Sequence, residues 1–128
     1  MESIHHFEDL EVWKLARKIN RKVYDYTSRD PLWHDFALVD QLRRSAGSIM
    51  DNISRGYERD GNKQFIDYLF LSKAACGECR SQIHRALDQN YLTQKEFDEL
   101  YELLIQQSQK LQALIRYLKK SNPPDRRT

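Results

Sequence analysis

The sequence of 128 residues contains no apolar run that approaches the ~20 residues needed to span a bilayer. Its first residues also lack the basic-then-apolar order of a signal peptide. We therefore expect a cytoplasmic protein without membrane contact. The net charge is only +2, which is too small to indicate a nucleic-acid partner by itself.

The motifs of common enzymes and metalloproteins are missing as well. There is no glycine-rich phosphate loop, no nucleophile elbow, and no Glu-x-x-His motif of the kind that a di-iron bundle needs. Cys76 and Cys79 lack the second cysteine pair of a zinc ribbon. His5 and His6 stand near a chain end, which rarely holds metal ligands in fixed geometry. We expect no enzymatic activity, no cofactor and no metal.

Apolar residues do recur, at steps of three and four, and this period predicts amphipathic helices. Two helices, over 35–59 and 62–88, meet at the break Asp60-Gly61-Asn62. The first has its apolar stripe at Leu38, Leu42, Ala46, Ile49, Ile53 and Tyr57. The second has its stripe at Phe65, Leu69, Ser72, Cys76, Cys79 and Ile83. Because both cysteines lie on that stripe, we expect buried core thiols rather than a redox pair.

Two further helices are predicted over 9–27 and 94–119. The stripe of the first is Val12, Ala16, Ile19, Val23 and Tyr26, widened by Trp13 and Leu15. The stripe of the second is Phe97, Leu100, Leu104, Gln107, Leu111, Leu114 and Leu118. The sequence thus predicts an all-α, antiparallel, up-down-up-down four-helix bundle over 9–120. Residues 1–8 would form a flexible lead-in and 121–128, which contain Pro-Pro, a flexible tail.

Several single residues carry local predictions. Thr93-x-x-Glu96 is a capping box, and Asn90 can adopt the left-handed conformation that ends a helix. Gly47 costs about 1 kcal/mol relative to alanine inside a helix, so it indicates a close helix approach or a kink, and Gly56 suggests the same. Gln107 stands at a core position, where we expect a hydrogen bond that sets the helix register or a place at a subunit contact.

The candidate binding residues are basic. On one predicted helix, Arg17 and Arg21 lie four residues apart, as do Lys18 and Lys22, and Arg43 and Arg44 lie in the next helix. Such a cluster is either a solvated helix face or a site for an anionic partner. Few aromatic residues fall outside the predicted core, so base stacking is not evident and contacts would be mainly to phosphates.

The sequence resembles a known family. The resemblance rests on Leu38-x-Asp40-Gln41-Leu42-Arg43-Arg44-Ser45-Ala46-x-Ser48-Ile49, on Asn52-Ile53-x-x-Gly56-Tyr57, on Lys63-x-Phe65-Ile66 and on Phe7-x-x-Leu10-x-Val12-Trp13-x-x-Ala16. The resemblance covers nearly the whole chain. The sequence is similar to the four-helix-bundle proteins encoded in intervening sequences of bacterial 23S ribosomal RNA genes. The sequence departs from the family pattern at Met50, where proline is frequent, and at Arg55, where glutamate is usual.

This resemblance implies a homo-oligomer, namely a ring of five subunits, without established enzymatic activity. The family is also similar to accessory bundle proteins of diversity-generating retroelements, which bind nucleic acid and a reverse transcriptase through basic surfaces. The leading hypothesis is therefore an oligomeric, nucleic-acid-binding accessory of a ribonucleoprotein. The alternative is a scaffold that assembles protein partners and does not contact RNA or DNA.

Overall fold

The computed structural model describes residues 3–121, and the regular structure in this part of the chain consists of helices alone. It contains helices α1 (Glu11–Thr27), α2 (Phe36–Tyr57), α3 (Asn62–Asp88) and α4 (Gln94–Lys120). Two short 3-10 helices, η1 (Phe7–Asp9) and η2 (Leu32–His34), precede α1 and α2. The prediction of an all-α protein with four helices is confirmed. The predicted tail from residue 122 onward lies outside the described residues.

The start of the chain differs from the expected lead-in. Ile4 and Phe7 pack against the core, and the carboxylate of Asp9 accepts hydrogen bonds from the backbone N–H groups of His5 and His6 at 3.0 and 3.1 Å. The Phe7 ring also meets Trp13 edge to face, with centroids 5.4 Å apart. Helix α1 then begins at Glu11, two residues later than predicted.

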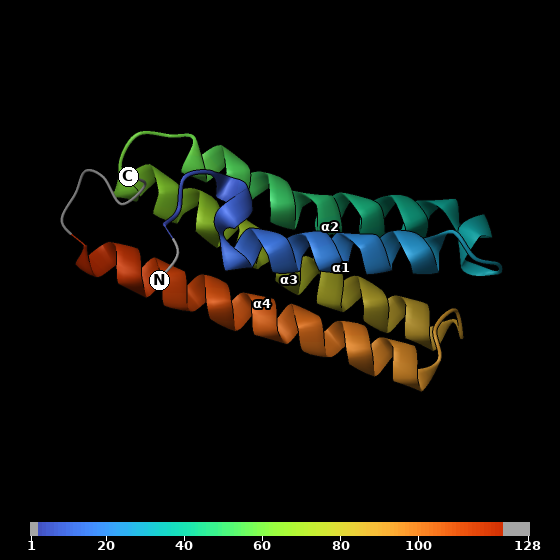
Figure 1. Cartoon of the computed structure of the whole chain (residues 1–128). Coiled ribbons are helices and arrows are strands. Elements are labelled where there is room, and N and C mark those ends of the chain that lie inside the picture. The colour runs from blue at the N-terminus through green and yellow to red at the C-terminus, as the bar shows by residue number, and fades with distance from the viewer. Residues whose placement is uncertain (1–2, 122–128) are drawn as a thin grey trace.

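The four helices lie side by side, and successive helices are joined at alternate ends of the bundle (Figure 1). Helix α1 packs on α2 and α4, and α3 packs on the same two helices. The α2–α3 interface is the most extensive and the α1–α4 interface the least.

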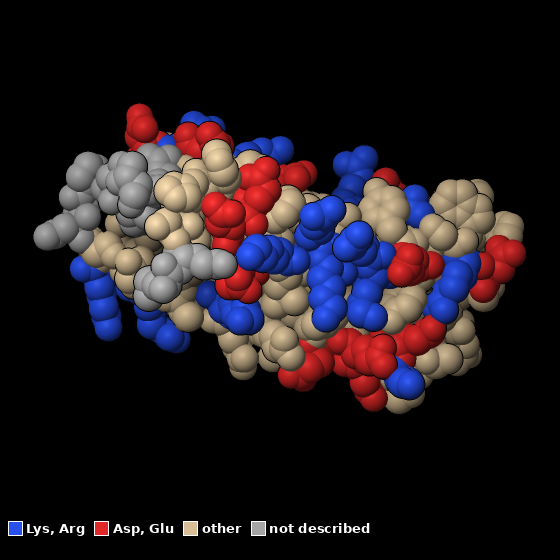
Figure 2. Space-filling model, in the orientation of Figure 1, with Lys and Arg blue, Asp and Glu red and all other residues tan. Residues whose placement is uncertain are grey.

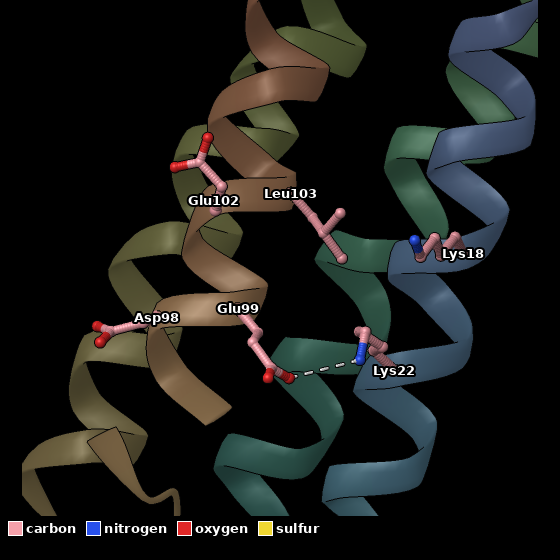
Figure 3. Close-up of a pocket in the computed structure, with 6 residues that line it drawn as sticks. All are labelled: Lys18, Lys22, Asp98, Glu99, Glu102 and Leu103. Carbon is pink, nitrogen blue, oxygen red and sulfur yellow. Dashed lines mark ion pairs between the residues drawn. The ribbon is translucent and has the colours of Figure 1, made fainter. Parts of the chain in front are cut away.

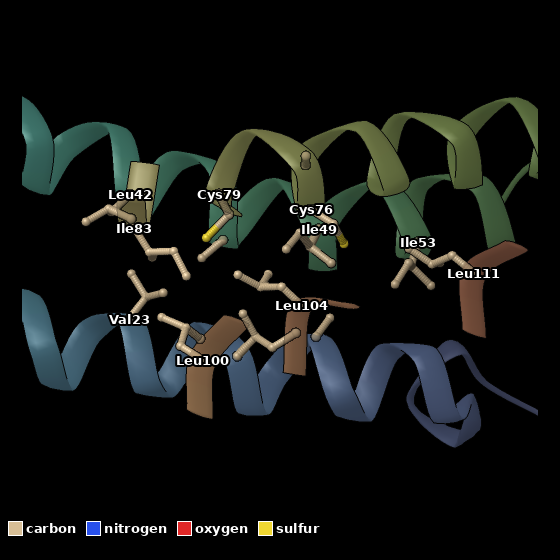
Figure 4. Packing of buried hydrophobic residues seen from close by; sticks show 14 of the residues in the cluster. Val23, Leu42, Ile49, Ile53, Cys76, Cys79, Ile83, Leu100, Leu104 and Leu111 are labelled. Atoms are coloured by element: carbon tan, nitrogen blue, oxygen red, sulfur yellow. The ribbon is translucent and has the colours of Figure 1, made fainter. Parts of the chain in front are cut away.

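The predicted stripes form one continuous core (Figure 4). All six stripe positions of α2 and all six of α3 are buried, including both cysteines, which are fully enclosed. Two stripe positions were wrong. In α1 the buried residue is Thr27, with Tyr26 only partly covered, and in α4 it is Ile115, with Leu114 partly covered. In both cases the helical period of 3.6 residues carries the stripe one position further than a step of three.

Several polar groups inside the core have specific partners, whereas the buried oxygens Asn62 Oδ1 and Gln107 Oε1 have none within residues 3–121. Gln107 Nε2 donates to the carbonyl of Val12 at 2.7 Å, which ties α4 to the first turn of α1, as expected of a register-setting side chain. Ser45 Oγ donates to Gln82 Oε1 at 2.6 Å, and Ser72 Oγ to the carbonyl of Ile49 at 2.8 Å. These bonds join α2 to α3 and satisfy hydroxyl groups that would be costly to bury alone.

The two glycines of α2 play different parts. A methyl group at Gly56 would lie 2.7 Å from Tyr68 Cβ and 3.2 Å from the carbonyl oxygen of Phe65, so α2 and α3 approach closely there. At Gly47 a methyl group would meet no atom within 4 Å. Close approach is therefore confirmed for Gly56. At Gly47 there is no close approach, and the other half of that prediction, a kink, stays a prediction.

The connections hold one end of the bundle together. Thr93 and Glu96 form the predicted capping box, with Glu96 N–H donating to Thr93 Oγ1 at 3.1 Å, and Asn90 adopts φ 62°. Arg29, after α1, donates to the Glu96 carboxylate at 2.7 Å. At this end Leu32 is buried, whereas the side chains of Trp33 and Phe36 are exposed.

Candidate nucleic-acid interface

Three of the predicted basic residues lie together on the outer side of α1. Arg17, Lys18 and Arg21 line a hollow of about 690 Å³ with Trp13, Lys14 and Glu8. Within residues 3–121, none of these three cations forms an ion pair, whereas Lys14 lies 3.4 Å from Glu11. Figure 2 shows the Lys and Arg side chains gathered over α1. We call Arg17, Lys18 and Arg21 the basic strip.

Lys22 does not extend the basic strip, because its side chain is directed to α4. Its Nζ lies 4.0 Å from Glu99 Oε2 across a hollow of about 500 Å³ between the two helices. Figure 3 shows Leu103 pointing from α4 toward α1, with the carboxylates of Asp98 and Glu102 turned away from α1. In the first half of α4, an acidic band therefore lies along one side of the basic strip (Figure 2). The acidic band consists of Asp98, Glu99 and Glu102. A polyanion is repelled from this side.

Arg43 and Arg44 lie in α2 but in separate environments. Arg44 Nε donates to Asp40 at 2.8 Å, an exposed pair four residues apart that neutralises its charge locally. Arg43 bridges α2 to the end of α1: Nε donates to Thr27 Oγ1 at 2.9 Å and Nη2 to Ser28 Oγ at 3.2 Å. The six predicted residues therefore do not form a single surface. Arg43 lies near the end of the basic strip, and Arg44 and Lys22 are held by acids.

One feature of this surface was missed in the sequence. The Arg43 guanidinium lies over two exposed aromatic rings, 4.2 Å from the centroid of Tyr24 and 5.4 Å from that of Trp33. Phe36 meets Trp33 edge to face, with centroids 6.0 Å apart. The expectation that few aromatic residues lie outside the core is wrong at this end of the bundle. The one signal in the sequence was that Tyr24 falls off the apolar stripe of its helix.

The two cysteine thiols, which were the other candidates for a reactive site, lie in the core. Burial raises the pKa of the Cys76 thiol to about 12 and that of Cys79 to about 11, so neither is a ready nucleophile. Residues 3–121 bring together no group of three His, Cys, Asp or Glu side chains that could hold a metal ion. Within the same residues, no helix is long and apolar enough to cross a membrane.

The fold and the surface define a small helical-bundle protein with a basic strip along one outer helix. The family model of the 23S rRNA-intervening sequence protein matches residues 8–113. The chain therefore belongs to this family, as the resemblance indicated. No curated protein matches it.

Among solved structures, the chain is similar to a protein with unknown function from the S23 ribosomal protein family of Bacteroides thetaiotaomicron. The TM-score is 0.75 at 17% sequence identity, and the match covers 82% of this chain and 98% of the other. At this identity the similarity shows a shared fold. Since the two sequences have diverged so far, a shared surface does not follow from it.

Proposed function

We propose that this protein is a non-enzymatic module that binds the phosphates of RNA or DNA through the basic strip. The observation that supports this most directly is the grouping of Arg17, Lys18 and Arg21 on adjacent turns, where the described residues place Glu8 in the same hollow but give none of the three an ion pair. Three cations on one helix that form no ion pair within residues 3–121 produce a positive field that attracts a polyanion. The name of the family refers to ribosomal RNA, which makes RNA a reasonable first partner to test.

The mode of binding follows from the side chains. Lysine and arginine contact phosphate oxygens without reading the base, so we expect weak dependence on base sequence. Binding releases counterions from the nucleic acid, and its affinity falls as salt rises. The acidic band of α4 would direct the strand to the opposite side of α1, toward α2.

The proposal is tested by fluorescence anisotropy with labelled RNA and DNA over a series of salt concentrations. Changing Arg17, Lys18 and Arg21 to glutamine should weaken binding. The slope of log affinity against log salt should fall by about one for each phosphate that the variant no longer neutralises. The matched control changes three exposed cations of the second half of α4, Lys110, Arg116 and Lys120, to glutamine. Because it removes the same charge, equal weakening in both variants would place the effect in the net charge and not in the basic strip.

The proposal also includes antiparallel helices in up-down-up-down order and a homo-oligomeric ring of five subunits. Short connections at alternate ends of the bundle favour this order. Self-association is supported by large apolar side chains that the single chain leaves exposed away from the basic strip, among them Leu71 and Tyr117. In a ring, each subunit would add one basic strip, so that many weak contacts act together. Light scattering should show a closed oligomer, and a monomer at high micromolar concentration would remove this part of the proposal.

The alternative is a scaffold for protein partners. It is favoured by the exposed side chains of Phe70 and Leu71 on α3 and Tyr117 on α4, which lie away from the basic strip on other helices. Native protein that binds neither RNA nor DNA at low salt would favour the scaffold.

A further inference from the structure

The end of α1 carries a second surface beside the basic strip. Tyr24, Trp33 and Phe36 are exposed by 45%, 42% and 65%, which is unusual for three large rings grouped at one end of a bundle. The Arg43 guanidinium lies over two of them. We call these four residues the aromatic cluster. It is formed by the last turns of α1, by η2 and by the first turns of α2.

The aromatic cluster keeps its positive charge. Within the described residues, Arg43 makes hydrogen bonds to two neutral hydroxyl groups and stacks on two rings, and it forms no ion pair with a carboxylate. Two acids of the neighbouring segments are held elsewhere: Asp30 lies 2.9 Å from the His34 ring and Asp40 is bonded to Arg44. An occupant of this surface therefore meets flat apolar rings and an uncompensated guanidinium together.

The cluster also continues the basic strip. Arg17, Arg21, Tyr24 and Ser28 follow one another at steps of four, three and four, so they share one face of α1. Arg43 reaches that face from α2 through its hydrogen bond to Ser28. Lys18, although part of the basic strip, also lines the hollow beside the acidic band, as Lys22 does. Arg17 and Arg21 instead share their helix face with Tyr24.

We propose that the aromatic cluster stacks the bases of a single-stranded nucleic acid whose phosphates lie along Arg17 and Arg21. Phosphates and bases alternate along a single strand, and this face presents cations followed by rings. Base faces stack on exposed tyrosine, tryptophan and guanidinium groups, while the bases of a duplex are already stacked on one another. An apolar protein surface would satisfy the rings but would leave the Arg43 charge without a partner. The inference rests on the proposed function and adds that the strand is single and held by its bases.

The test compares four labelled probes of one length: single-stranded RNA, single-stranded DNA, the duplex, and an abasic DNA strand that keeps every phosphate. Native protein should bind both single strands more tightly than the duplex or the abasic strand. Changing Tyr24 and Trp33 to leucine should weaken single-strand binding by roughly tenfold or more, because each stacked base contributes substantially. It should leave the salt slope and the affinity for the abasic strand unchanged. The matched control, Phe70→Leu with Tyr117→Leu, removes two exposed rings elsewhere but keeps an apolar side chain at both positions. Light scattering should give it the oligomer size of the native protein, and it should then bind as the native protein does.

A second readout follows Trp33 directly. In a Trp13→Phe background, Trp33 is the one remaining tryptophan. Its fluorescence should be quenched by the single strands and not by the abasic strand. Equal affinity for all four probes, with full binding by the Tyr24→Leu/Trp33→Leu variant, would overturn the stacking inference and leave phosphate binding intact. Absence of binding to every probe would instead refute the proposed function itself.

Discussion

The two glycines of α2 allow one substitution to be tested twice in the same helix with opposite expected results. At Gly47 an added methyl group meets no atom within 4 Å. Alanine is better than glycine inside a helix by up to about 1 kcal/mol, since glycine loses more backbone entropy on folding. We expect Gly47→Ala to raise the free energy of unfolding by about 0.5–1 kcal/mol.

At Gly56 the same substitution meets a packed neighbour. The new methyl carbon would lie 2.7 Å from Tyr68 Cβ, 3.0 Å from a ring carbon of Phe65 and 3.2 Å from the Phe65 carbonyl oxygen. Two of these atoms are fixed to the α3 backbone, so the contact is relieved only if the helices move apart. Overpacking of this kind costs typically about 1–3 kcal/mol. Because Gly56 is next to the last residue of α2, little helix preference offsets that cost, and we expect a net loss of about 1–2 kcal/mol.

Urea unfolding followed by circular dichroism measures both effects. The protein concentration is kept constant, because self-association would otherwise shift the apparent stability. The midpoint should rise for Gly47→Ala and fall for Gly56→Ala, with the slope against urea unchanged in both. Shifts of the same sign in the two variants would refute the packing argument, because the loss expected at Gly56 comes from its neighbour on α3.

Two other predictions concern the core and the loop end of the bundle. Cys76 and Cys79 should react with a thiol reagent only after denaturation, and replacing both with alanine should lower the free energy of unfolding by about 1–3 kcal/mol; fast labelling of the native protein would contradict their burial. The carboxyl pKa of Glu96 is lowered to about 2, first by the hydrogen bond from Arg29 and then by the backbone N–H of Thr93. A lowered pKa stabilises the fold above the ordinary value of 4.5, and this contribution is lost as the pH falls from there toward 2. Between pH 4.5 and pH 2, the urea midpoint should decline less in Glu96→Gln than in the native protein. If the midpoint falls equally with pH in both proteins, the Arg29–Glu96 pair contributes nothing to stability.

The helices themselves follow closely from the sequence, since their signals are local. Steps of three and four place the buried residues of α2 and α3 correctly, and the capping box at Thr93 marks the start of α4. Each of these signals lies within one or two turns of helix, where side-chain spacing and backbone hydrogen bonds decide the outcome. The burial of both cysteines follows from the same spacing.

The candidate site depended on contacts between helices, and only the tertiary structure decided it. Lys22 was assigned to the basic surface, but its position relative to Glu99 is set by how α4 packs beside α1. Likewise, Gly47 and Gly56 look alike in one helix and differ only in whether α3 stands opposite. The period of a single helix determines which residues face the core. It leaves undetermined which neighbour flanks each outer edge, and so the fold alone brought Arg43 of α2 to the rings of Tyr24 and Trp33.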